Sequence, residues 1–325
     1  MRTEILKILK SEEGYVSGQE LCGLLGVSRT AVWKAVQQLQ TEGYEIEAKR
    51  NRGYRLTEGK DVFTATEIKS LLNTKRVGQN LVFLESVDST NNEARRRAEQ
   101  GAPDGTLVVA LEQSAGKGRR GRSWVSAPGG GIWMSLLLRP EFMPENASML
   151  TLLAAMAVQT GIRQAAGIEG QIKWPNDVVL DGKKVCGILT EMSTEMECIR
   201  YVVIGIGINV DICEFPEEIR QVATSIRLCT GKTVRRARLA AAVAEAWEYY
   251  YEKFLETMDL SLLMEEYNRM LVNIGGEVKV LAPKGDYTGV SRGINEKGEL
   301  LVETGEGIST VMSGEVSVRG IYGYV

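Results

Sequence analysis

The sequence contains no histidine among its 325 residues, and its five cysteines are widely spaced. Without histidine, a serine or cysteine nucleophile lacks the partner that usually activates it. The cysteines are odd in number and form no CxxC pair, which argues against a zinc site and a disulfide framework. These absences exclude triad hydrolases, and we expect no metal held by protein ligands alone.

Long apolar runs are missing too, and no segment approaches the length that spans a membrane. The N-terminal segment MRTEILKILKSEEG is too charged for a signal peptide. We therefore expect a cytoplasmic protein without membrane contacts. The hydrophobic content of 44% is ample for a large core, and the chain length suggests about two or three domains.

Charge of one sign is scarce, since the formal net charge is -3. The first 60 residues carry ten Lys and Arg against eight Asp and Glu, a small excess. Any contact with DNA must therefore come from local clustering of basic residues.

Residues 1–62 predict a winged helix-turn-helix domain. After a first amphipathic helix around residues 5–9, Ser17 opens a second helix and Ser28 opens a third over Arg29–Thr41. Two short strands within residues 44–56 then form a basic wing. A small helical interaction domain with a solvated wing is the alternative.

We expect the third helix in the major groove and the wing on phosphates. The residues expected at the DNA are Gly18, Ser28, Arg29, Thr30, Trp33, Lys34, Arg50 and Arg52. Trp33 has its own alternative as a half-buried core residue.

The central region, residues 63–271, predicts an α+β layer fold with a mixed or antiparallel sheet, because hairpin-linked strands outnumber helices. The main helices are expected at Glu93–Gln100, Ala147–Ala166, Ala237–Leu255 and Leu260–Leu271. The segment Gly205–Val210, GIGINV, lacks both the third glycine and the following helix of a dinucleotide loop.

The segment Gln113–Trp124, QSAGKGRRGRSW, combines three glycines with four basic residues and no acid, directly after an apolar strand at Thr106–Leu111. Glycines let backbone N–H groups approach a ligand, and arginines offer paired donors to phosphate or carboxylate oxygens. The pattern predicts a site for a negatively charged small molecule, with a solvated basic loop as the alternative. We expect the loop to be mobile when empty.

Ser89, Thr90 and Asn91 stand together at a predicted helix start. Their hydroxyl and amide groups suit a neutral polar head group such as a ureido ring, and an ordinary helix N-cap is the alternative.

Five motifs occur in order: DSTN at 88–91, EQSAGKGRRGRSW at 112–124, KWPND at 173–177, GKKVCGIL at 182–189 and GIGINV at 205–210. On these motifs the chain resembles bifunctional biotin–protein ligases that also repress biotin operons. The resemblance covers essentially the whole chain. It implies a winged helix-turn-helix at 1–62, a mixed-sheet ligase domain related to class II synthetases at 63–271, and an SH3-like β-barrel at 272–325.

The C-terminal region supports the last of these by its own pattern. Five short, turn-linked strands predict a small SH3-like barrel, whose alternative role is a stabilising cap. The strands are expected at Glu277–Leu281, Asp286–Ile294, Gly298–Glu303, Ile308–Met312 and Glu315–Arg319.

The resemblance implies two half-reactions. Biotin and MgATP give biotinyl-5′-AMP and pyrophosphate, and the adenylate then acylates a lysine of a biotin carboxyl carrier protein. Charge that builds on the phosphate oxygens is stabilised by fixed Arg and Lys donors and by Mg²⁺. The resemblance further implies operator DNA as a partner and a homodimer when the adenylate is bound.

The resemblance also implies roles for individual residues, with Arg119 and Lys184 as the catalytic pair. Lys117 stands where the family often has arginine, so it keeps the charge without the bidentate fork. Biotin contacts are expected from Ser89, Thr90, Asn91, Gln113, Gly116, Lys117, Gly118, Arg119 and Lys184. ATP or adenylate contacts are expected from Lys117, Arg119, Arg122, Trp124, Asn176, Asp177 and Asn209, with the roles of the last three open.

Three other functions stay open. The first is a monofunctional ligase with a vestigial DNA domain, and the second is a lipoate-type ligase that shares the catalytic fold. The third is a non-enzymatic transcription factor that senses biotin.

Overall fold

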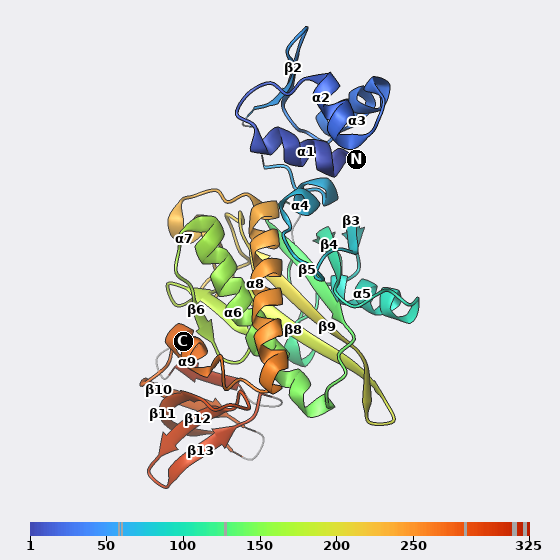
Figure 1. Cartoon of the computed structure of the whole chain (residues 1–325). Coiled ribbons are helices and arrows are strands. Elements are labelled where there is room, and N and C mark those ends of the chain that lie inside the picture. Colours follow the sequence, from blue (N-terminus) through green and yellow to red (C-terminus); the bar gives the residue numbers. More distant parts are fainter. Residues whose placement is uncertain (58, 60, 127–128, 283–284, 314–316, 321–323) are drawn as a thin grey trace.

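Three units follow one another along the chain, as the computed structural model in Figure 1 shows. The structure describes residues 1–57, 59, 61–126, 129–282, 285–313, 317–320 and 324–325. Within these residues, no helix has the length and apolar character needed to cross a membrane.

The N-terminal unit is a winged helix-turn-helix with its own apolar core. Both predicted helix caps are present, because Ser17 Oγ accepts from Glu20 N and Ser28 Oγ accepts from Ala31 N. The wing strands pair antiparallel, and residue 54 also forms a bridge with residue 16. The elements are α1 (Arg2–Ser11), α2 (Gly18–Leu25), α3 (Arg29–Thr41), β1 (Ile46–Lys49) and β2 (Gly53–Leu56).

The central unit is built on a seven-stranded mixed sheet in the order β3-β4-β5-β9-β8-β7-β6. The β3–β4 pair is parallel and every other pair is antiparallel. The predicted mixed sheet is therefore confirmed. Its strands are β3 (Leu81–Val87), β4 (Thr106–Gln113), β5 (Gly131–Leu138), β6 (Gln171–Lys173), β7 (Asp177–Leu180), β8 (Lys183–Glu195) and β9 (Cys198–Asn209).

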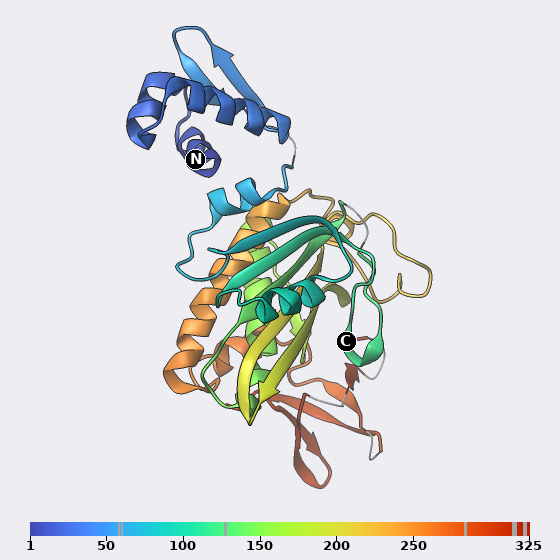
Figure 2. The same ribbon diagram turned by 90° about the vertical axis from the view of Figure 1, so that its right-hand side faces the viewer.

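Helices cover both faces of this sheet (Figures 1 and 2). The largely buried helix α6 (Met149–Ala166) and α8 (Arg236–Thr257) pack together on one face, and α5 (Thr90–Glu99) lies on the other. Helix α4 (Ala65–Leu71) contacts α1 of the N-terminal unit and α8. The remaining helical segments are η1 (Arg119–Gly121), η2 (Pro144–Ser148), α7 (Ile226–Thr230) and α9 (Met264–Met270).

The C-terminal unit is a five-stranded antiparallel sheet in the order β13-β12-β11-β10-β14. It agrees with the predicted barrel in the number of strands. Its strands are β10 (Glu277–Leu281), β11 (Tyr287–Ile294), β12 (Leu300–Thr304), β13 (Gly307–Val311) and β14 (Ser317–Gly320). Glu315, the predicted start of the last strand, lies outside the described residues.

Two predicted helix starts are wrong by three or more residues. Helix α5 begins at Thr90 rather than Glu93, so Ser89 is its N-cap residue and Thr90 and Asn91 lie in its first turn. Helix α9 begins at Met264 rather than Leu260, because the chain first makes a tight turn in which Leu263 N donates to Leu260 O.

Candidate active site

Two adjoining pockets share part of the loop that follows β4. The narrow one, about 50 Å³, is lined by the β3–α5 turn, the end of β4 and strands β8 and β9. The wide one, about 330 Å³, is lined by the KWPND turn, the segment that follows β9 and the C-terminal unit. Five residues line both pockets: Gly118, Arg119, Trp124, Asn176 and Lys184. These residues mark the place where two reactants bound in the two pockets would meet.

The narrow pocket ends in a neutral polar network. Thr90 donates to Gln113 Oε1 through its backbone N at 2.7 Å and its hydroxyl at 3.0 Å. Ser135 Oγ lies 2.8 Å from Thr90 Oγ1 and 2.6 Å from Asn91 Oδ1. Ser89 lines the pocket and its side chain makes no helix-cap bond, so the N-cap alternative is wrong for this side chain.

Asn91 is held on both ends by the protein. Its Nδ2 donates to Glu191 Oε2 at 2.7 Å, and its Oδ1 faces Ser135. A Cβ atom on Gly205 would lie 2.2 Å from Asn91 Oδ1, so a larger residue there would displace this amide. The sequence reasoning missed Ser135 and Glu191, which belong to strands without a motif at these positions. The alternating small residues of GIGINV are the one available signal for Gly205.

Trp124 lies at the boundary of the two pockets. A Cβ atom on Gly187 or Gly207 would approach its ring within 2.7 or 2.8 Å. Lys184 Nζ lies 5.3 Å from the ring centroid. The indole N–H is buried and has no hydrogen-bond partner among the described residues, so it is available to a ligand. The predicted position beside a nucleotide base stays a prediction.

The boundary residues form a charged cluster. Lys184 Nζ lies 2.5 Å from Asp177 Oδ1. Arg119 donates to Asn176 Oδ1 at 2.9 Å and to Ser313 O of the C-terminal unit at 2.6 Å. Burial lowers the pKa of the Arg119 guanidinium, the nearby Asp177 carboxylate opposes this shift, and the group remains cationic.

The Gly/Arg loop, residues 114–126, folds as a narrow hairpin. Gly118 N donates to Arg122 O at 2.7 Å, and Trp124 N donates to Gly116 O at 2.8 Å. A Cβ atom on Gly116 would lie 2.5 Å from the Trp124 carbonyl oxygen, so this crossing requires glycine. Exposed Arg122 lines the wide pocket. The expected mobility of the empty loop stays a prediction.

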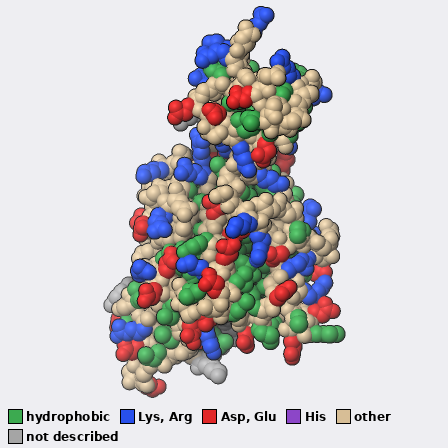
Figure 3. Space-filling model, viewed as in Figure 1, with side chains coloured by type: hydrophobic (Ala, Val, Ile, Leu, Met, Phe, Trp, Pro, Cys, Tyr) green, Lys and Arg blue, Asp and Glu red, His purple; other side chains and the backbone are tan. Residues whose placement is uncertain are grey.

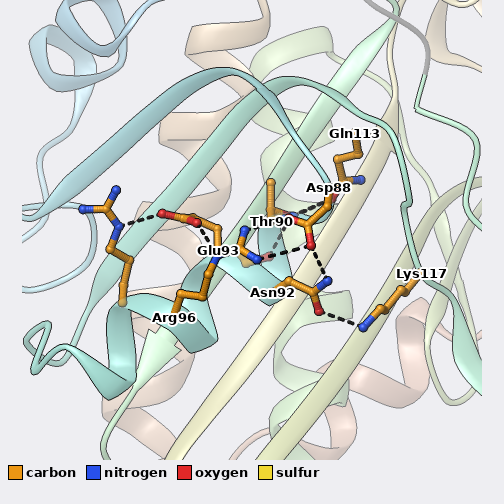
Figure 4. A network of polar contacts seen from close by, with 9 residues as sticks. Asp88, Thr90, Asn92, Glu93, Arg96, Gln113 and Lys117 are labelled. Atoms are coloured by element: carbon orange, nitrogen blue, oxygen red, sulfur yellow. Dashed lines mark hydrogen bonds and ion pairs between the residues drawn. The ribbon is translucent and has the colours of Figure 1, made fainter.

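Lys117 is tied to the start of α5 (Figure 4). Its Nζ donates to Asn92 Oδ1 at 2.7 Å, and Asn92 Nδ2 donates to Asp88 Oδ2 at 2.6 Å. The Arg96 guanidinium beside Asp88 holds the pKa of that carboxyl well below its usual range. These contacts fix the β3–α5 turn against the Gly/Arg loop. The sequence alone did not indicate Asn92 or Arg96 as part of this network.

Asn209 lies at the wide pocket and is buried. Its Nδ2 donates to Thr224 O at 3.0 Å, so this amide anchors the segment after β9. Lys183 is exposed at the β7–β8 hairpin, whereas the side chain of Lys184 lines both pockets.

The predicted DNA-contacting residues of α3 are exposed, and basic side chains gather on the N-terminal unit at the end away from the rest of the chain (Figure 3). Trp33 is 50% exposed and is not part of the apolar core of this unit. Arg29 donates to Gln19 Oε1. The Arg52 guanidinium lies 4.7 Å from the Tyr15 ring centroid, and Arg50 is exposed. Gly18 is half-buried beside Tyr54 of the wing, and as a glycine it could contact DNA only through its backbone.

Comparison with known proteins agrees with this architecture. Residues 83–209 match the Biotin/lipoate A/B protein ligase family, residues 2–55 match the HTH domain, and residues 274–319 match the Biotin protein ligase C terminal domain. The crystallised biotin protein ligase from Aquifex aeolicus in complex with biotin and ATP superimposes with a TM-score of 0.67 at 37% identity. That match covers 74% of this chain and 99% of the Aquifex chain.

Full-length relatives include the N-terminal unit as well. The chain is 41% identical to Bifunctional ligase/repressor BirA of Bacillus subtilis, over 98% of both chains. It is 30% identical to Bifunctional ligase/repressor BirA of Escherichia coli, over 97% of this chain and 96% of that protein. The fold and site thus define the class of biotin protein ligases. Within that class, the chain belongs to the family of bifunctional ligase/repressor proteins.

Proposed function

We propose that the chain joins biotin to ATP, transfers biotin to a carrier-protein lysine, and represses transcription when loaded with the adenylate. The observation that carries the ligase half is the continuous cleft. A neutral polar pocket at one end suits a ureido ring, and cationic side chains stand where that pocket meets the wider one. Biotin lies in the narrow pocket and the nucleotide in the wide one.

In the first half-reaction, the biotin carboxylate attacks the α-phosphate of ATP and pyrophosphate leaves. Lys184 and Arg119 border both pockets, so their charges lie where negative charge builds on the phosphate oxygens. Arg122 adds a second cation from the loop. Glu214 lines the wide pocket and would offer a carboxylate toward Mg²⁺, which would neutralise the leaving pyrophosphate.

In the second half-reaction, the amine of a carrier lysine attacks the acyl carbon of biotinyl-5′-AMP and AMP leaves. The adenylate itself supplies the activated acyl group, so no protein nucleophile takes part. This agrees with a chain that lacks histidine. The expected carrier is a biotin carboxyl carrier protein.

The repressor half rests on the exposed α3 and the basic wing. Helix-turn-helix proteins commonly bind operators that consist of two half-sites, and each half-site takes one copy of the protein. We therefore propose that the adenylate-bound protein binds operator DNA as a homodimer. A gel shift with operator DNA, with and without biotin plus ATP, tests this half. An unchanged shift would show that ligand and DNA binding are not coupled here. The cytoplasmic location predicted from the sequence stays a prediction.

Biotin-dependent release of pyrophosphate from MgATP tests the ligase half. Lys184→Met should lower the rate by roughly a hundredfold, because it removes a charge aimed at the reacting phosphate. Lys183→Met is the matched control, since this neighbour is exposed and lines neither pocket. Equal effects of the two substitutions would contradict the assignment of Lys184.

Lipoate is the competing substrate, because the matched family model includes lipoate ligases. Its dithiolane ring has no ureido group and would leave the network around Gln113 and Thr90 without ligand partners. Pyrophosphate release that depended on lipoate and not on biotin would indicate a lipoate ligase.

A further inference from the structure

Tyr324 reaches into the wide pocket from the segment that follows β14. Its hydroxyl donates to Asp177 Oδ2, while Asp177 Oδ1 faces Lys184 Nζ at 2.5 Å. The two oxygens of one carboxylate therefore join the C-terminal unit to the proposed catalytic lysine. None of the five motifs includes Tyr324.

Tyr324 is suited to donate this hydrogen bond at any working pH. Burial, followed by the adjacent Asp177 charge, raises the pKa of its phenol well above the usual range. The hydroxyl therefore stays protonated and can only donate to the carboxylate. Asp177 is itself buried, so the bond is shielded from competing water.

The ring of Tyr324 also contacts a second lysine of the pocket, Lys173. Lys173 Nζ lies 4.3 Å from the ring centroid. Among the described residues, Lys184 is the one cation with a side-chain nitrogen within 4.0 Å of the Asp177 carboxylate. The phenol ring therefore lies against Lys173, and the Asp177 carboxylate pairs directly with Lys184.

We propose that Tyr324 is a positioning residue for adenylate formation. By holding Asp177 in one orientation, it keeps the Lys184 ammonium at the boundary of the two pockets, where the biotin carboxylate and the α-phosphate meet. The inference rests on the proposed ligase function. It gives the C-terminal unit a direct part in the first half-reaction.

Tyr324→Phe tests the inference, because it removes the hydroxyl and keeps the ring on Lys173. Loss of a hydrogen bond to a buried charged group corresponds to roughly a tenfold change. We expect kcat for biotin-dependent pyrophosphate release to fall by about that factor. The KM for biotin should stay within about twofold, because the ureido network lies in the other pocket.

Tyr287→Phe is the matched control. Its hydroxyl contacts Ser309 Oγ at 3.0 Å within the same C-terminal sheet, and it does not line the wide pocket. This variant should release pyrophosphate at the rate of the unmodified chain. A loss as large as that of Tyr324→Phe would show that both substitutions act through folding of the C-terminal unit, which would overturn the inference.

A double-mutant cycle with Asp177→Ala tests the route through the carboxylate. If Tyr324 acts through Asp177, the phenylalanine substitution should have no further effect once that carboxylate is gone. A full tenfold effect in both backgrounds would overturn the proposed route. A Tyr324→Phe variant that is faster than the unmodified chain would show that the hydroxyl hinders the reaction, and this result would likewise overturn the inference.

The outcomes separate this inference from the function on which it rests. No biotin-dependent release from the unmodified chain would overturn the proposed function and the role of Tyr324 together. An active unmodified chain and an equally active Tyr324→Phe variant would overturn the role of Tyr324 alone.

Discussion

Replacing Lys173 by methionine should change how the stability of the protein depends on pH. Lys173 ends β6, is 7% exposed, and faces the ring of Tyr324. Burial lowers the pKa of its ammonium from 10.5 to about 8, and the Asp177 carboxylate only partly opposes the shift. The folded chain therefore carries a desolvated charge at neutral pH.

The sign of the effect follows from proton binding. Between about pH 8 and pH 10.5 the unfolded chain keeps the Lys173 proton and the folded chain loses it. The free energy of unfolding contributed by this site therefore rises with pH through that window and is lowest below pH 8. The shift corresponds to a few kcal/mol at most, taking about 1.4 kcal/mol for each pH unit.

Chemical denaturation followed by tryptophan fluorescence at several pH values between 7 and 10.5 measures this effect. We expect the free energy of unfolding of the unmodified chain, relative to Lys173→Met, to rise by roughly 2–3 kcal/mol across the window. Lys279→Met sets the baseline, because this ammonium is already half-exposed to water in its pair with Asp286. A difference between the unmodified chain and Lys173→Met that does not vary with pH would refute the reasoning.

Three further substitutions test other parts of the molecule. Gly205→Ala should weaken biotin binding at least tenfold by calorimetry, because its Cβ atom displaces Asn91, and unchanged binding would contradict the packing. Glu67→Gln leaves the Lys10 ammonium, now 2.6 Å from Glu67 Oε1, without its charge partner, and should lower the free energy of unfolding by about 1–3 kcal/mol in thermal scans. Gly53→Ala should weaken operator binding at least tenfold in a gel shift and spare pyrophosphate release, because φ is 106° and a Cβ atom would lie 2.0 Å from a backbone oxygen.

Local chemistry made the N-terminal unit predictable from its sequence. Ser17 and Ser28 each accept a hydrogen bond from the backbone amide three residues later, at the start of a helix. The cap and the helical spacing of apolar residues therefore both appear within one short stretch of sequence. The wing turn is equally local. The strand order of the central sheet, in contrast, could not be predicted from local sequence. Strand β9 lies between β5 and β8, and β3 pairs parallel with β4 at the edge of the sheet. Such pairings depend on long-range packing, which no short window of sequence contains.

The same distinction explains the site. The Gly/Arg loop, Lys184 and the Ser89–Asn91 turn are recognisable because each belongs to a motif. Ser135, Glu191 and Tyr324 were missed because each acts through a partner that is distant along the chain. Tyr324 is separated from Asp177 by 147 positions, and Asn91 from Glu191 by 100. Their surroundings in the sequence give no sign of a polar contact.

The glycines of the two strand motifs acquire a physical meaning from the sheet register. Gly187 in β8 and Gly207 in β9 are paired across the ladder, and Gly205 lies on the same face of β9 as Gly207. Side chains at these positions would fill the space that the Trp124 ring and the Asn91 amide occupy. The narrow pocket therefore exists because these positions carry no side chains. The backbone of β8 and β9 lines one side of it, and side chains from the Gly/Arg loop and α5 line the others. A family resemblance indicates that these glycines belong to the site, and the register explains which neighbours a side chain at each position would displace.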